Sequence, residues 1–133
     1  MRNRSSQNDA KKESDDTNDV AVVFVKNGDK YLAVSCQEDF SNLNMPGGHI
    51  KEGESPISAA SRETQEETGI KVSGLKLLFV AIQMEKKVHV FHAEDFSGDL
   101  QSSCEGIACW EPKENMMNGQ YCDTFKRAMK IYK

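Results

Sequence analysis

Residues 48–70 of this chain read GHIKEGESPISAASRETQEETGI, and their middle part predicts an α-helix over residues 55–69. Ser55 is a good N-cap, because its side-chain oxygen can accept a backbone N–H of the first turn. Pro56 suits the first helical position, where no N–H donor is needed. Gly69 suits the end of the helix, where a left-handed backbone conformation is common. The stretch therefore predicts a capped helix that follows a short loop.

Two faces of this helix differ in character. One is small and semi-polar at helical spacing, which predicts close packing rather than burial of bulky groups; it holds Ile57, Ala60, Ser61, Thr64 and Thr68. On the other face, positions i, i+3 and i+4 place three carboxylates side by side, those of Glu63, Glu66 and Glu67.

The three carboxylates have few cationic neighbours along the helix. Ala59 and Ile70 stand about one turn away, and only Arg62 is adjacent. A solvated helix surface usually mixes charges of both signs, although a plain acidic surface remains the alternative. A divalent cation would relieve the repulsion, and Mg²⁺ prefers such oxygen ligands.

The spacing of these residues resembles the Nudix box. That pattern is a glycine, five residues, a glutamate, seven residues, Arg-Glu, an apolar residue, any residue, Glu-Glu, any residue, a glycine and an apolar residue. This chain matches it from Gly48 through Glu54 and Arg62 to Gly69. Thr64 departs from the pattern at the first apolar position, and we expect its hydroxyl to bond back to a helix carbonyl at a small cost in stability.

The resemblance implies an α/β fold, a Nudix-type α/β/α sandwich with a mixed β-sheet between helices. It also implies that water hydrolyses a nucleoside diphosphate linked to another group, with Mg²⁺ or possibly Mn²⁺ as cofactor. Glu63, Glu66 and Glu67 would hold the metal together with the carbonyl of Gly47. Arg62 would pair with the glutamates and orient them, the alternative being an ordinary surface salt bridge.

Further roles follow from the same resemblance. The catalytic base would be Glu67 or a carboxylate outside the box. Glu105 resembles an additional metal-binding glutamate of MutT-type members, although a solvated loop acid is the alternative. Glu54 would support the joint between loop and helix. Gly48 and Gly69 would be structural, because a backbone that approaches a metal or turns sharply has no room for a Cβ atom.

The expected substrate is a nucleoside triphosphate, possibly oxidised. Residues 88–93, Glu105 and Trp110 resemble the compact MutT-type branch, which releases monophosphate and pyrophosphate. Asn118 stands where such members place a base-reading amide, and a helix-cap role is its alternative. The other substrates considered are ADP-ribose, a nucleotide sugar, a dinucleoside polyphosphate and an RNA cap. A non-catalytic nucleotide sensor is less favoured, because the box glutamates are all present.

The remaining pattern predicts strands around the helix. A hairpin is expected around Asn27-Gly28, then a loop over residues 36–46, and a terminal helix follows the last strand. The expected strands are 20–25, 30–35, 47–50, 75–83, 87–93 and 107–111. His89 and His92 would lie on opposite faces of one strand, so both cannot point into one site.

The length of 133 residues fits a single domain, and the polar composition of residues 1–19 predicts a disordered tail. The resemblance then implies that residues 20–133 form the Nudix domain. The net charge of −4 argues against duplex nucleic acid or an anionic membrane as partner. No apolar run is long enough to span a bilayer. The four cysteines lack zinc-ligand spacing and suit a reducing cytoplasm; they are Cys36, Cys104, Cys109 and Cys122.

Overall fold

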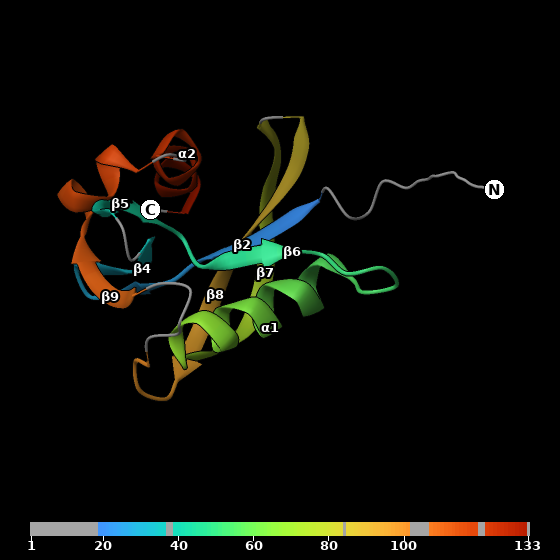
Figure 1. Ribbon diagram of the computed structural model, residues 1–133, viewed down its shortest axis with the longest axis horizontal. Helices are drawn as coiled ribbons and strands as arrows, with labels where there is room; N and C mark the ends of the chain where they lie inside the picture. The colour runs from blue at the N-terminus through green and yellow to red at the C-terminus, as the bar shows by residue number, and fades with distance from the viewer. Residues whose placement is uncertain (1–18, 37–38, 84, 102–106, 120–121, 133) are drawn as a thin grey trace.

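The computed structural model describes residues 19–36, 39–83, 85–101, 107–119 and 122–132 (Figure 1). The predicted tail therefore lies outside the described residues, except for Asp19. The backbone carbonyl of Asp19 accepts a hydrogen bond from the N–H of Ile50 at 3.0 Å. No helix within these ranges is long and apolar enough to cross a membrane.

A mixed four-stranded sheet forms the centre of the molecule, in the order β6-β2-β8-β7. Its strands are β2 (Val20–Phe24), β6 (Gly47–His49), β7 (Lys71–Gln83) and β8 (Lys86–Ser97). β2 runs parallel to β8, while the β2–β6 and β7–β8 pairs are antiparallel. The predicted mixed sheet is thus confirmed, and β7 and β8 are longer than the sequence pattern indicated.

A second sheet contains β3 (Lys26–Asn27), β4 (Lys30–Cys36), β5 (Asp39–Asn44) and β9 (Ile107–Pro112). The chain turns at Gly28, and the short β3 before the turn pairs with β4 after it, whereas β2 belongs to the central sheet. The predicted hairpin of 20–25 with 30–35 was therefore wrong in its first arm. The loop predicted for 36–46 was also wrong, because β5 pairs with β4 and buries Leu43 in spite of its polar sequence.

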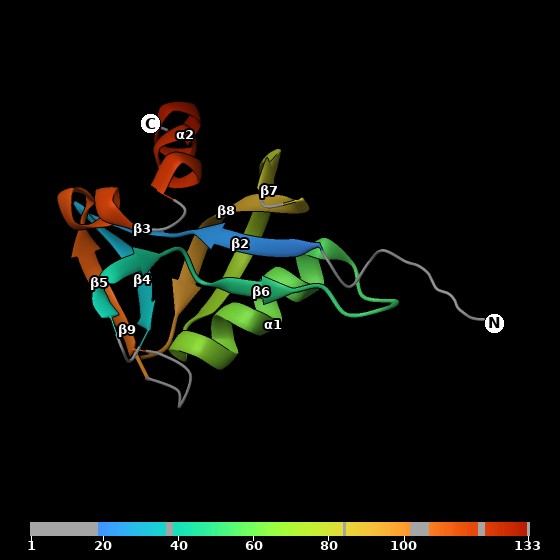
Figure 2. The same ribbon diagram turned by 45° about the horizontal axis from the view of Figure 1, so that its top comes forward.

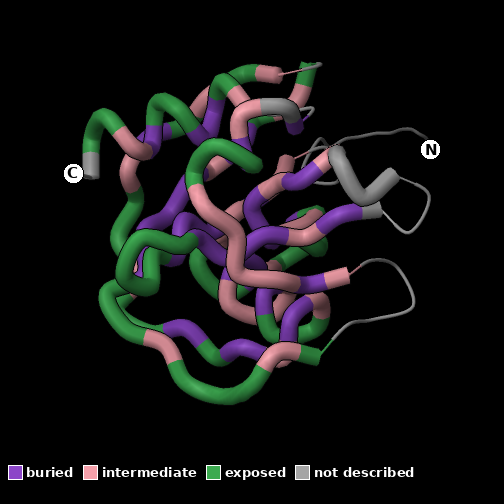
Figure 3. The backbone as a smooth tube through the Cα atoms, turned by 90° about the vertical axis from the view of Figure 1, so that its left-hand side faces the viewer, coloured by how far each residue is buried: buried purple, intermediate pink, exposed green. Residues whose placement is uncertain are grey.

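Helices cover both faces of the central sheet, which confirms the predicted α/β/α sandwich (Figures 1 and 2). α1 (Pro56–Thr68) packs on one face with Ala21, Val23 and Phe91 in the core. α2 (Cys122–Tyr132), preceded by the 3₁₀ helix η2 (Lys113–Asn118), covers the other face, where Phe24 and Val90 are buried. Figure 3 shows the buried segments concentrated between the exposed outer turns.

The predicted ends of α1 are confirmed. The Ser55 hydroxyl accepts the N–H of Ser58 at 3.2 Å. Gly69 has a φ of 81°, and its N–H donates to the carbonyl of Gln65 at 2.9 Å. Its left-handed conformation strains any residue with a side chain, which explains a glycine at this position.

The packing face of α1 is rotated relative to the prediction. Ala60, Thr64 and Thr68 are buried as expected, but Ala59 is also buried whereas Ile57 is 44% exposed. Successive residues are separated by about 100° around a helix, so Ala59 and Ile57 point to nearly opposite sides. The rotation brings Ala59 to the sheet and turns Ile57 toward solvent.

Candidate active site

Arg62 links the loop before α1 to the acidic face of the helix. Its Nε and Nη2 donate to the two carboxylate oxygens of Glu54 at 2.7 and 2.9 Å. Its Nη1 donates to Glu63 at 3.0 Å and to Glu66 at 3.2 Å, and Nη2 also reaches the carbonyl of His49 at 3.2 Å. The Arg62 side chain is only 22% exposed. The guanidinium thus bonds three carboxylates and one carbonyl at once, whereas an isolated surface salt bridge has a single partner.

The charge of Glu54 is stabilised by this arrangement. The hydrogen bonds from Arg62, followed by that from the backbone N–H of Lys51 at 3.0 Å, lower the pKa of Glu54 to about 2. The hydrogen bonds of Arg62 to Glu54 and then to Glu63 raise the pKa of Arg62. Glu54 therefore remains ionised at any physiological pH and anchors the loop to the helix.

Glu63 and Glu67 both pack closely against the glycines at β6. The backbone N–H of Gly47 donates to Oε1 of Glu67 at 2.8 Å. A Cβ atom at Gly48 would collide with the carboxylate of Glu63. This confirms the expectation that Gly48 has no room for a side chain. Between β6 and α1, the Glu67 carboxylate thus lies against Gly47 and the Glu63 carboxylate against Gly48.

The residues on this face suit a divalent cation in their chemistry. They offer carboxylate oxygens, which hard cations prefer, and the glycine backbone lies directly against one of them. In the part of the chain that the structure describes, no three His, Cys, Asp or Glu side chains converge on a common point. Glu63 and Glu66 instead share Arg62, while Glu67 binds Gly47. Glu66 is 59% exposed and therefore has freedom to reorient.

Thr64 and Thr68 behave differently beneath the acidic face. Both are fully buried. The hydroxyl of Thr68 donates to the carbonyl of Thr64 at 2.6 Å and accepts the N–H of Ile70 at 3.0 Å. The Thr64 hydroxyl has no hydrogen-bond partner among the described residues. The prediction that the Thr64 hydroxyl bonds back to a helix carbonyl was therefore wrong. Thr68 makes this kind of hydrogen bond instead.

Other residues singled out by the sequence lie away from this face or outside the described chain. Glu105 falls within 102–106 and lies outside the described residues. Asn118 is the last residue of η2, and its side chain is also not among those described. His89 pairs with Ala21 on the α1 side of the sheet, whereas His92 contacts Phe24 on the α2 side. The two histidines therefore lie on opposite faces, as predicted.

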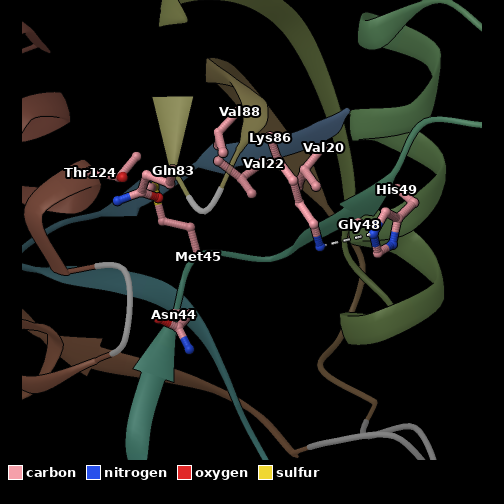
Figure 4. A pocket seen from close by; sticks show the side chains of 10 residues that line it. All are labelled: Val20, Val22, Asn44, Met45, Gly48, His49, Gln83, Lys86, Val88 and Thr124. Atoms are coloured by element: carbon pink, nitrogen blue, oxygen red, sulfur yellow. Dashed lines mark hydrogen bonds between the residues drawn. The ribbon is translucent and has the colours of Figure 1, made fainter. Parts of the chain in front are cut away.

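A cavity of about 170 Å³ begins at Gly48 and extends to α2 (Figure 4). Pockets that enclose a whole drug-sized ligand are usually roughly 300–1,000 Å³, so this one suits part of a ligand. It is lined by Val20, Val22, Asn44, Met45, Gly48, His49, Gln83, Lys86, Val88 and Thr124.

The cavity has a charged end and an apolar middle. Nζ of Lys86 lies 3.5 Å from Nε2 of His49, next to Gly48 (Figure 4). Sequence reasoning missed Asn44, Gln83, Lys86 and Thr124, which belong to no motif. One signal was available for Gln83. Residues an even number of positions apart in a strand share a face, so Gln83 lies on the same face as the buried Phe79 although it is polar.

Comparisons with known proteins agree with this architecture. The model of the NUDIX domain matches residues 16–125. The asymmetrical bis(5'-nucleosyl)-tetraphosphatase of Mus musculus is 31% identical over 86 residues, covering 57% of this chain and 58% of the relative. The 8-oxo-dGDP phosphatase NUDT18 of Danio rerio is 32% identical over 89 residues, covering 65% of this chain and 27% of the relative. The chain thus spans less than two thirds of the length of these curated relatives.

Solved structures share the fold at lower identity. The MutT protein of Bacillus halodurans superposes with a TM-score of 0.70 at 22% identity, covering 86% of this chain and 82% of the other. A MutT NUDIX hydrolase of Burkholderia pseudomallei gives 0.73 at 17% identity, covering 87% and 98%. The shared fold and the matched family model agree on the class of this domain. The chain belongs to the NUDIX family.

Proposed function

We propose that this chain is a pyrophosphohydrolase that uses a divalent metal to convert nucleoside triphosphates, including oxidised ones, to monophosphate and pyrophosphate. The observation that carries the proposal is the position of the cavity, which begins at Gly48, the residue packed against Glu63. A nucleotide in this cavity would have its base toward α2 and its phosphates near the acidic face of α1. Lys86 and His49 would meet the negative charge of the substrate at the same end.

In this proposal Glu63, Glu66 and Glu67 hold Mg²⁺ or Mn²⁺, with the carbonyl of Gly47 and with Glu105 as further ligands. When bound, the ion supplies positive charge to the phosphates and lowers the pKa of the attacking water. Arg62 orients two of the carboxylates through hydrogen bonds of 3.0 and 3.2 Å.

The chain's own residues also handle the proton of the attacking water. Glu67 or Glu105 accepts that proton, and the Gly47 N–H keeps the Glu67 carboxylate in place. Asn118 contributes to recognition of the base. Apart from charge neutralisation and positioning, hydrolysis of a phosphoric anhydride needs little from the protein.

A dinucleoside polyphosphate is the second candidate substrate, because the tetraphosphatases of mouse and rat are 31% and 33% identical to this chain over 86 residues. Both candidates use the same box and differ in the group that leaves.

We also propose a cytoplasmic location, which suits the two free thiols of Cys109 and Cys122.

A substrate panel with product analysis tests the proposal. It contains the nucleoside triphosphates, their 8-oxo purine forms, dinucleoside polyphosphates, ADP-ribose and nucleotide sugars, each with Mg²⁺. Pyrophosphate with a nucleoside monophosphate supports the first candidate. Turnover only of a bridged compound supports the second and overturns the first. Tight nucleotide binding without any turnover would overturn both and indicate a sensor.

A further inference from the structure

Two buried polar atoms without partners belong to residues that line the cavity. Among the described residues, four buried side-chain nitrogen or oxygen atoms lack a hydrogen-bond partner, and two of these belong to cavity-lining residues, Oε1 of Gln83 and Oγ1 of Thr124. Buried polar groups in proteins are nearly always hydrogen-bonded, because an unpaired one costs free energy. Two such atoms in one cavity are therefore available to a ligand that supplies the missing partners.

The two side chains come from elements distant in the sequence. Gln83 is the last residue of β7, and Thr124 lies in the first turn of α2, where it is 4% exposed. In Figure 4 both lie toward one end of the cavity, with His49 and the Lys86 ammonium group toward the other end. The polar pair and the charged pair are therefore separated along the cavity.

The walls between these ends are apolar. Val20, Val22 and Val88 line one side, and Met45 lines the cavity between Asn44 and Gly48. Walls of this kind suit the faces of a flat ring, and one edge of that ring would reach Gln83 and Thr124. An amide oxygen only accepts hydrogen bonds, whereas a hydroxyl both donates and accepts. The complementary edge carries an N–H donor beside a ring nitrogen.

We propose that Gln83 and Thr124 select nucleobases that carry an exocyclic amine. Oε1 of Gln83 accepts a hydrogen bond from the amine, and the hydroxyl of Thr124 bonds to the neighbouring ring nitrogen. This inference rests on the proposed function, because it assumes that the ligand is a nucleotide with its phosphates near Gly48. Guanine and adenine both offer such an edge, through the 2-amino and the 6-amino group respectively.

Matched substrate pairs test the inference on the wild-type protein. GTP and ITP differ by the 2-amino group alone, and ATP and purine riboside triphosphate differ by the 6-amino group alone. We expect kcat/KM to favour the amine-bearing member of one pair by about three- to tenfold, the usual effect of one neutral hydrogen bond. The pair that shows the preference identifies the amine. Equal kcat/KM within both pairs would overturn the inference and leave the proposed function intact.

Substitutions assign the preference to the two residues. Gln83→Leu removes the acceptor and is expected to abolish the preference, whereas Gln83→Glu retains an acceptor oxygen and should preserve it. Thr124→Val removes the hydroxyl at nearly constant shape and should lower kcat/KM for the preferred base, while Thr124→Ser should restore it. A preference that survives both Gln83→Leu and Thr124→Val would overturn the assignment.

Binding of monophosphates separates this inference from the proposed function. Titration calorimetry on the wild-type protein compares GMP with IMP, and AMP with purine riboside monophosphate. It requires no turnover, and it does not depend on whether a variant folds. Selective binding of the amine-bearing member by a protein that hydrolyses nothing would support the recognition site and contradict the enzymatic proposal. Equal binding within both pairs would overturn the recognition site directly.

Discussion

The carboxylate of Glu63 occupies the space that a Cβ atom at Gly48 would need. The Glu63 carboxylate can lie this close to β6 only because residue 48 has no side chain. The glycine at the start of the box therefore positions an acidic side chain, in addition to its place in the strand pair with Ala21.

Gly48→Ala should separate activity from stability. The new methyl group displaces Glu63, so we expect kcat to fall at least about tenfold, as for loss of a group that positions a metal ligand. The matched control is Gly28→Ala. Gly28 has a φ of 66° and no heavy atom within 4 Å of an added Cβ, so the change strains the backbone without a collision. It should lower the free energy of unfolding by about 1 kcal/mol and leave kcat unchanged. Kinetics and thermal denaturation of both variants measure the contrast; the opposite pattern would refute this role of Gly48.

Glu67→Gln should remove activity while the fold persists. Glutamine keeps an oxygen that can accept the N–H of Gly47, now 2.8 Å from the Glu67 carboxylate. Loss of the negative charge should lower kcat by about 100-fold or more, because replacement of outer groups around a metal already costs 10–100-fold. Glu114→Gln, at an exposed position of η2, is the control and should behave as wild type. Titration of Mn²⁺ by electron paramagnetic resonance should show weaker binding in the Glu67 variant. An unchanged affinity and an unchanged kcat would remove Glu67 from the site.

The Glu54–Arg62 pair predicts a stability contribution that depends on pH. The pKa of Glu54 falls from 4.5 to about 2 in the folded protein, so folding favours the ionised form. The contribution is complete above about pH 4.5 and is lost as the pH falls toward 2. The melting temperature of wild type should therefore exceed that of Glu54→Gln most clearly above pH 4.5, and the two should converge in acid. Glu52→Gln, at an exposed position in the same loop, is the control. If the difference in melting temperature between wild type and Glu54→Gln grew as the pH fell, it would contradict the stabilising role of the Glu54–Arg62 pair.

Two buried threonines of α1 should respond to the same substitution with opposite signs. Thr64→Val removes a buried hydroxyl that has no partner among the described residues, and it should raise the free energy of unfolding by about 1 kcal/mol. Thr68→Val removes the acceptor of the Ile70 N–H and should lower it by about 1–3 kcal/mol. Urea denaturation of both variants measures the difference. If both changes destabilised the protein equally, the Thr64 hydroxyl would have a partner in solution.

Local signals predicted the centre of the molecule well. Ser55, Pro56 and Gly69 fixed the ends of α1, because caps act through nearby backbone groups. The box spacing predicted the acidic face of that helix, and alternation along the strand predicted the opposite positions of His89 and His92.

Features that depend on contacts between residues far apart in the sequence could not be predicted from local signals. β5 is polar and resembles a loop, but its pairing with β4 decides its conformation. Ile57 is exposed because α1 turns Ala59, rather than Ile57, toward the sheet. Gln83 and Thr124 line one cavity only after β7 and α2 have packed on one another, so no spacing in the sequence relates them.

The most direct test of the central claim is product analysis by ³¹P NMR with nucleoside triphosphates, with Mg²⁺ and with EDTA, for wild type and Glu67→Gln in parallel. We predict that wild type with Mg²⁺ releases nucleoside monophosphate and pyrophosphate. We also predict that EDTA and the substitution each suppress the reaction about 100-fold or more. Turnover at an equal rate in all samples, or no turnover of any nucleotide by the folded protein, would contradict the claim that the acidic face of α1 is a metal-dependent hydrolytic site.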